Sequence, residues 1–122
     1  MAKILAVDDS PTVLKIVRLA MSSLGHSVTI CNSGEEAIRL IEDSKDFDLG
    51  IFDYNLPGIS GISLIKKALA LQSKRNFKII VLSSENNQTL VDEALEVGAS
   101  GWVHKPFENQ ELINLINSLV TE

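Results

Sequence analysis

The chain has 122 residues, the usual size of a single domain, and we expect one domain over residues 1–122. Apolar residues make up 45% of it, which is enough for a packed core and excludes a disordered tail, a collagen or a bare coiled coil. Its 16 acidic and 11 basic residues give a net charge of −5 without a basic stripe, so nucleic acid is not expected as a direct partner.

The sequence predicts five β-strands that alternate with five helices. The strands are expected at residues 3–7, 27–31, 48–53, 78–82 and 101–104. In the first gap, Ser10 is placed to cap a helix, Pro11 suits its first turn and Gly25 suits its end. Its apolar positions repeat at three- and four-residue steps: Val13, Ile16, Val17, Ala20, Met21 and Leu24.

The later helices follow the same pattern. The second is expected to begin with a capping box, Ser33-Gly-Glu-Glu36. The apolar positions of the second to fifth helices are Ala37, Ile38 and Ile41; Leu64, Ile65, Ala68 and Leu69; Leu90, Val91, Ala94 and Leu95; and Leu112, Leu115, Ile116 and Leu119. Strict alternation of strand and helix predicts an α/β fold: a doubly wound parallel sheet covered by helices on both faces.

Ligands of such sheets bind at the carboxyl ends of the strands, where strand order reverses. Here Asp8 and Asp9 follow the first strand, Asp53 ends the third, Ser83 follows the fourth and Lys105 follows the fifth. The second strand ends without an ionisable group. If it lies at an edge, in the order 2-1-3-4-5, the other four ends are contiguous and three carboxylates meet.

Three carboxylates in one crevice need a counter-ion. Two of them about 5 Å apart repel by about 3 kcal/mol at an effective dielectric constant of ~20, and Mg²⁺ with its oxygen ligands removes that cost. Lys105 and the hydroxyl of Ser83 suit phosphoryl oxygens. Each residue alone also fits an ordinary role in a turn, a helix cap or the surface, but their joint occurrence favours metal-assisted phosphoryl transfer onto a carboxylate.

The pattern resembles the receiver domain of two-component response regulators, in its stand-alone chemotaxis (CheY-like) form. The resemblance rests on the residues above and on Gly98-Ala-Ser-Gly-Trp-Val-His-Lys-Pro-Phe107, and it covers the whole chain. It implies the flavodoxin-like (βα)5 fold with strand order 2-1-3-4-5, which is the known order of this family. It also implies a cytoplasmic signalling protein that is not an enzyme but catalyses its own phosphorylation and dephosphorylation.

The resemblance assigns a role to each site residue. Asp53 accepts a phosphoryl group from a histidine kinase. Asp9, Asp53 and the backbone carbonyl of Asn55 bind Mg²⁺ directly, while Asp8 binds it through water. Lys105 pairs with the acyl phosphate, and the Lys105–Pro106 peptide is expected to be cis.

The resemblance also assigns residues to the conformational switch and to the control of phosphate lifetime. Ser83 binds the phosphoryl group and Trp102 turns inward as Ser83 moves, while Asn55 and Glu85 modulate how long the phosphate lasts. Serine replaces the commoner threonine of the family at position 83, and tryptophan replaces tyrosine or phenylalanine at position 102. Serine lacks the methyl group that stiffens χ1, so a looser switch is expected.

The resemblance also implies how the signal leaves. With no output domain in 122 residues, a monomer is expected to contact a downstream protein through its fourth helix, fifth strand and fifth helix. The flagellar motor switch is one candidate target, although Asn86-Asn87-Gln88 is uncharged where motor-binding relatives are rich in lysine. The single cysteine, Cys31, and the absence of a secretion leader or a membrane-length apolar run favour the cytoplasm.

Three other readings are less favoured. A haloacid-dehalogenase-like phosphatase places its nucleophile on the first strand with an aspartate two residues later, but Asn55 stands at that place after Asp53 and cannot transfer the proton. A flavodoxin-like cofactor binder would need donors for the flavin phosphate where Asp8 and Asp9 stand. A docking module without phosphorylation would not need every acidic ligand to be present.

Overall fold

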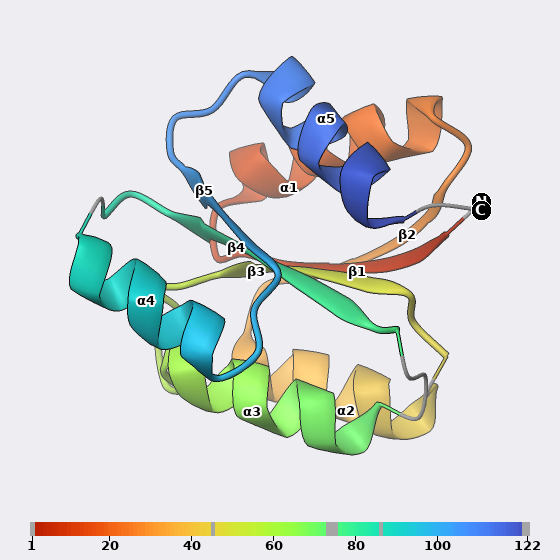
Figure 1. Ribbon diagram of the computed structural model, residues 1–122. Coiled ribbons are helices and arrows are strands. Elements are labelled where there is room, and N and C mark those ends of the chain that lie inside the picture. The colour runs from red at the N-terminus through yellow and green to blue at the C-terminus, as the bar shows by residue number, and fades with distance from the viewer. Residues whose placement is uncertain (1, 45, 73–75, 86, 121–122) are drawn as a thin grey trace.

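A computed structural model describes residues 2–44, 46–72, 76–85 and 87–120, so Asn86 of the uncharged loop lies outside the described residues. The chain forms one parallel sheet with the order β2-β1-β3-β4-β5 (Figure 1). The strands are β1 (Lys3–Val7), β2 (Ser27–Cys31), β3 (Leu49–Asp53), β4 (Lys78–Ser83) and β5 (Gly101–His104). The fold class and strand order predicted from the sequence are therefore confirmed.

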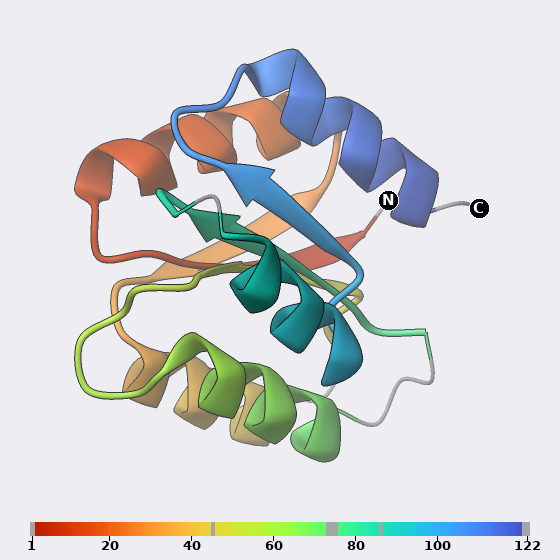
Figure 2. The same cartoon turned by 60° about the vertical axis from the view of Figure 1, so that its left-hand side comes forward.

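The helices cover both faces of this sheet. Helices α1 (Pro11–Ser23) and α5 (Asn109–Leu119) lie on one face. Helices α2 (Gly34–Asp43), α3 (Gly61–Leu71) and α4 (Gln88–Glu96) lie on the other, as two views show (Figures 1 and 2). Among the described residues, no helix has the length and apolar character needed to cross a lipid bilayer.

The sheet divides the core into two apolar clusters. Leu5 and Val7 of β1 face the cluster under α2, α3 and α4, whereas Ile4 and Ala6 face the one under α1 and α5. This alternation follows from the two-residue period of a strand, and it explains why β1 is apolar on both faces. The burial of both faces fixes the strand in register and holds its carboxyl end in place.

The helix ends mostly follow the predicted signals. The hydroxyl of Ser10 accepts a hydrogen bond from the backbone N–H of Val13 at 3.3 Å, and Gly25 adopts a positive φ of 89° just after α1. The Ser33 hydroxyl likewise accepts from the N–H of Glu36 at 3.2 Å. The return bond of a capping box, from the Ser33 N–H to the Glu36 side chain, is absent among the described residues, so α2 has half of that motif.

The structure corrects the extent of some elements. Strand β3 begins one residue later than predicted and β4 ends one residue later, at Ser83. The apolar repeats are also wider than the buried faces of the helices, because Ile16, Leu24 and Leu95 are exposed. Helix α4 buries only Ala94 and is therefore the helix with the smallest buried face.

Candidate functional site

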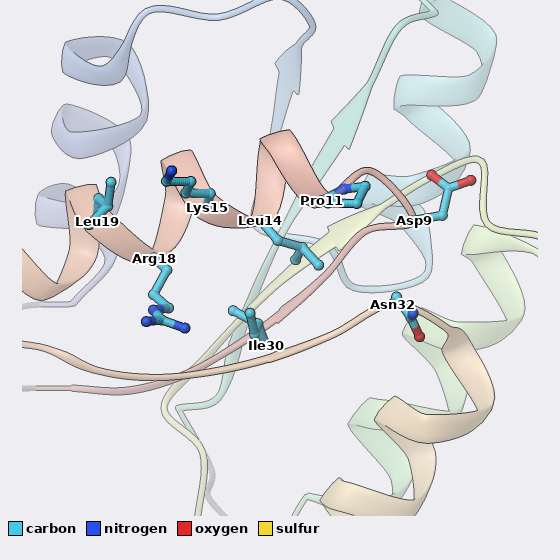
Figure 3. A pocket seen from close by; sticks show the side chains of 8 residues that line it. All are labelled: Asp9, Pro11, Leu14, Lys15, Arg18, Leu19, Ile30 and Asn32. Atoms are coloured by element: carbon cyan, nitrogen blue, oxygen red, sulfur yellow. The ribbon is translucent and has the colours of Figure 1, made fainter.

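Two features lie near the carboxyl ends of the strands, and the first is a hollow between α1 and β2 (Figure 3). It has a volume of about 410 Å³, and Leu14, Leu19 and Ile30 form apolar parts of its wall. Of the three carboxylates predicted to bind metal, Asp9 alone lines it. The predicted chemistry therefore belongs beside this hollow rather than inside it.

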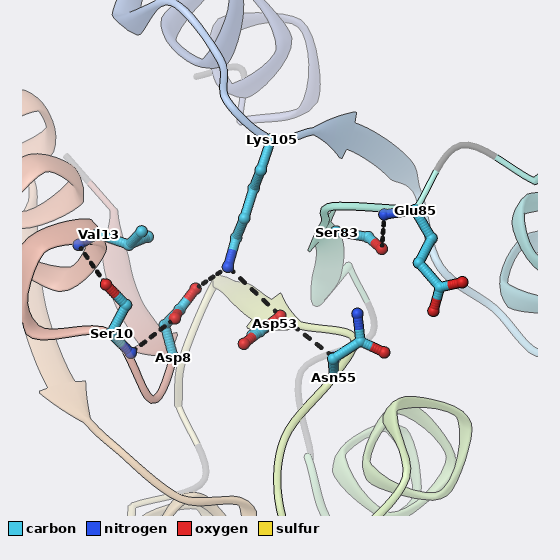
Figure 4. A network of polar contacts seen from close by, with 8 residues as sticks. All are labelled: Asp8, Ser10, Val13, Asp53, Asn55, Ser83, Glu85 and Lys105. Atoms are coloured by element: carbon cyan, nitrogen blue, oxygen red, sulfur yellow. Dashed lines mark hydrogen bonds and ion pairs between the residues drawn. The ribbon is translucent and has the colours of Figure 1, made fainter.

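The second feature is a polar cluster at the ends of four strands (Figure 4). Asp8 follows β1, Asp53 ends β3, Ser83 ends β4 and Lys105 follows β5. These strands are consecutive neighbours in the sheet, since β2 lies at its edge beyond β1. The sheet order thus brings together side chains that are up to 97 residues apart in sequence.

Three carboxylates form the acidic part of the cluster. One oxygen from each of Asp8, Asp9 and Asp53 lies within 4.8 Å of the other two. Asp8 and Asp53 are 1% and 3% exposed, whereas Asp9 is exposed to solvent. All three offer hard oxygen donors, the ligand type that Mg²⁺ prefers, so the residues present fit such an ion.

Lys105 is the counter-charge within this cluster. Its Nζ donates a hydrogen bond to Oδ2 of Asp8 at 2.8 Å and lies 3.5 Å from Oδ1 of Asp53. Figure 4 shows the side chain reaching down between the two carboxylates. The Lys105–Pro106 peptide is cis, as the resemblance implies, and the Lys105 backbone N–H donates to the carbonyl of Ser83 at 2.7 Å. Lys105 is therefore joined to β1, β3 and β4.

The environment of Asp53 disfavours the charged form of its carboxylate. Burial, followed by the charge of Asp8, raises its pKa above the ordinary value. The backbone N–H of Asn55, which donates to Oδ1 at 3.2 Å, and the ammonium of Lys105 lower the pKa but do not cancel that rise. A cation bound at this carboxylate would offset the cost of its buried negative charge.

Asp8 also builds the loop that carries it. Its Oδ1 accepts a hydrogen bond from the backbone N–H of Ser10 at 2.9 Å, directly before the Ser10 cap of α1. The two carboxylate oxygens of Asp8 therefore have different partners, because Oδ1 holds the turn while Oδ2 faces Lys105.

Ser83 is fully buried at the end of β4 and does not cap the following helix. Asn87 caps α4 by accepting from the N–H of Thr89 at 2.8 Å. The Ser83 hydroxyl instead accepts from the N–H of Glu85 at 2.9 Å, which turns the loop after the strand. Because this contact uses Ser83 as an acceptor, its O–H remains available to donate a hydrogen bond to a phosphoryl oxygen.

Sequence reasoning gave no role to His104 and none to Tyr54, yet both contact the switch region. The Nε2 of His104 lies 3.1 Å from the carbonyl oxygen of Ser84 and is placed to donate to it. The ring of Tyr54 lies 5.3 Å from that of Trp102, at an interplanar angle of 50°. The signals available were the position of His104 beside Lys105 and the position of Tyr54 directly after Asp53.

The side chain of Trp102 is partly buried, and its indole Nε1 points into the protein. Its indole N–H is buried without a hydrogen-bond partner among the described residues. The pKa of Tyr54 is raised, first by burial and then by the charges of Glu93 and Glu85. Asn55 and Glu85, the two residues expected to modulate phosphate lifetime, are exposed beside the cluster.

Comparisons with known proteins agree with this arrangement. Residues 4–117 match the response regulator receiver domain family. A chemotaxis protein CheY homolog from Campylobacter jejuni is 34% identical over 111 residues, which are 90% of this chain and 85% of the relative. The structure of the chemotaxis response regulator CheY4 of Vibrio cholerae gives a TM-score of 0.88 at 33% identity, over 98% of this chain and 99% of that one.

A second similar structure contains a metal. The receiver domain of the sensor histidine kinase PA1611 from Pseudomonas aeruginosa gives a TM-score of 0.83 at 28% identity, over 97% of this chain and 96% of that one. It is described with a magnesium ion coordinated in its active-site cleft. Fold, site and similarity lead to one conclusion: the chain belongs to the response regulator receiver domain family, and its relatives point to the CheY-like type.

Proposed function

We propose that Asp53 accepts a phosphoryl group from a histidine kinase and that the modified chain then binds a downstream protein. The observation that carries this proposal is the buried carboxylate of Asp53, which has Lys105 at 3.5 Å and two further carboxylates within 4.8 Å. A structural salt bridge would pair one acid with one base. Here Lys105 pairs with Asp8 and Asp53, and Asp9 has no ion pair among the described residues, which favours a divalent cation as part of the working site.

Each residue then has a defined task. Asp9, Asp53 and the Asn55 carbonyl would hold Mg²⁺ directly and Asp8 would hold it through water, where the ion supplies charge neutralisation for the phosphoryl oxygens. A carboxylate oxygen of Asp53 forms the new P–O bond as the P–N bond to the donor histidine breaks, and the imidazole leaves. Lys105 neutralises a phosphoryl oxygen, and the hydroxyl of Ser83 donates a hydrogen bond to another.

The output is proposed to be a protein contact of a single-domain chain. The Campylobacter relative, whose length the matched region covers to 85%, is named as a chemotaxis protein, and this supports a CheY-like role in chemotaxis. The face formed by α4, β5 and α5 would carry the signal from a monomer in the cytoplasm. A stand-alone receiver of another phosphorelay is the alternative, and the uncharged run Asn86-Asn87-Gln88 favours it over the flagellar motor.

The test is incubation with acetyl phosphate and Mg²⁺, followed by intact-protein mass spectrometry. The parent should gain one phosphoryl group, and Asp53→Asn should gain none because an amide is a poor nucleophile. Asp43→Asn, which changes the same residue type on the exposed end of α2, is the matched control and should be labelled like the parent. Undiminished labelling of Asp53→Asn would falsify the assignment. Turnover of a generic phosphate ester would instead support the phosphatase reading.

A further inference from the structure

The excess negative charge of the chain is confined to one stretch of its sequence. Residues 85–119 contain six acidic residues and one basic residue, Lys105, whereas the rest of the chain has ten of each. This stretch contains α4, β5 and α5, so the net charge of −5 is carried entirely by the face proposed above for output. The six acidic residues are Glu85, Asp92, Glu93, Glu96, Glu108 and Glu111.

The structure leaves these charges on the surface. All six side chains are exposed, and none of them forms an ion pair within the described part of the chain. Lys105 does not offset them, because its ammonium is engaged by Asp8 and Asp53 inside the site. A surface that keeps carboxylates together without cations suits a partner that brings the cations.

An apolar anchor lies among the carboxylates of α4. Leu95 is 46% exposed, and Asp92 and Glu96 lie three residues before it and one after it on the helix. The other exposed large apolar side chains among the described residues, Ile16, Leu19 and Leu24, belong to α1 or its end. Ala94 is the one buried residue of α4, Leu90 and Val91 are partly buried, and the other side chains of this helix are exposed.

The acidic surface is continuous with the switch residues. Glu85 and Glu93 come from the loop before α4 and from α4 itself, and both charges act on the hydroxyl of Tyr54. Tyr54 in turn contacts the ring of Trp102 on β5. A ligand that covers the α4 carboxylates would therefore adjoin the residues that are proposed to move.

We propose that the surface formed by Glu85, Asp92, Glu93, Leu95 and Glu96, here called the acidic face, docks a basic amphipathic segment of a partner protein. An apolar side chain of that segment packs on Leu95, and its Lys or Arg side chains pair with the surrounding carboxylates. Nucleic acids, anionic membranes and acidic segments are repelled by the same charges. This inference rests on the proposed output face and adds the chemistry of its partner.

The test uses two synthetic helical peptides of equal length, one of Leu and Lys and the other with Glu at every Lys position. Binding is measured by fluorescence anisotropy at two salt concentrations. The basic peptide should bind, with an affinity that falls as salt rises, and the acidic peptide should not. Asp92→Asn with Glu96→Gln should weaken binding of the basic peptide about tenfold, the effect of losing two exposed ion pairs and their shared field. Leu95→Ser should weaken it as well.

The matched control is Asp43→Asn with Glu42→Gln, which removes the same two residue types from α2 on the other side of α3. An equal loss of affinity in this control would mean that the basic peptide is attracted by the net charge alone, and it would overturn the proposal. Tight binding of the acidic peptide, or no binding of the basic peptide, would overturn it too. Phosphorylation by acetyl phosphate is measured on the same variants. Unlabelled parent protein would contradict the proposed function, whereas the peptide result decides the acidic face alone.

Discussion

Removing the charge of Asp53 should stabilise the metal-free protein, although it abolishes the proposed phosphorylation. At an effective dielectric constant of ~20, a carboxylate pair at 4.8 Å repels by about 3.5 kcal/mol, and Asp53 has two such neighbours. On the same scale, Lys105 at 3.5 Å attracts by about 5 kcal/mol, which leaves a net repulsion of roughly 2 kcal/mol. For a chain of 122 residues, this corresponds to a rise in Tm of about 8 °C for Asp53→Asn.

The assay is thermal unfolding followed by circular dichroism at pH 7 in EDTA. Glu42→Gln on the exposed face of α2 changes the net charge equally and should leave Tm nearly unchanged. The pKa of Asp53 is raised in the folded state, so the penalty is absent below the ordinary pKa of 3.8, grows as pH rises from there to the raised pKa, and is complete above it. The gap between variant and parent should therefore narrow towards pH 4. A variant that melts at or below the parent at pH 7 would refute the assumed repulsion.

Three further outcomes are expected. Mg²⁺ at a hundredfold excess over its Kd should stabilise the parent by about 2.7 kcal/mol, and Asp9→Ala should lose most of that response in the same melting assay; an equal shift in both would place the metal elsewhere. Beryllofluoride should move Trp102 emission to shorter wavelength and reduce iodide quenching, and Ser83→Ala should weaken both effects; unchanged emission would make Trp102 a fixed wall residue. Burial raises the pKa of Cys31 from 9.0 to about 12, so its thiol should resist Ellman's reagent at pH 8 when folded and react in urea, whereas rapid labelling of the folded chain would contradict its burial. The contribution of the buried, protonated Cys31 thiol to the free energy of unfolding should be present below pH 9 and lost as pH rises towards 12.

The fold could be predicted from sequence because its signals are local and repeated. Each strand is a short apolar run, and cap residues such as Ser10 and Ser33 precede the first two helices. The meeting of Asp8, Asp53 and Lys105 could also be predicted, since all three follow from the rule that parallel strands end at one edge. Strand order itself came from the family resemblance and from the position of the one uncharged strand end.

The remaining features depend on distances that no local pattern encodes. The contact of His104 with Ser84 and that of Tyr54 with Trp102 each join side chains from different segments, and their spacing is set by how the loops pack. The exposure of Leu95 was also missed, because an apolar repeat shows which residues can face a core but not how far that core extends. Tertiary packing decided both.

The small buried face of α4 has a consequence for the local stability of this helix. A helix that buries one residue, Ala94, loses little apolar contact when it opens, so we expect its local opening free energy to lie below that of global unfolding. Helix α3, which buries Gly61, Leu64, Ile65 and Ala68, has no such freedom. Amide hydrogens of α4 should therefore exchange with solvent faster than those of α3, which hydrogen exchange followed by mass spectrometry would measure.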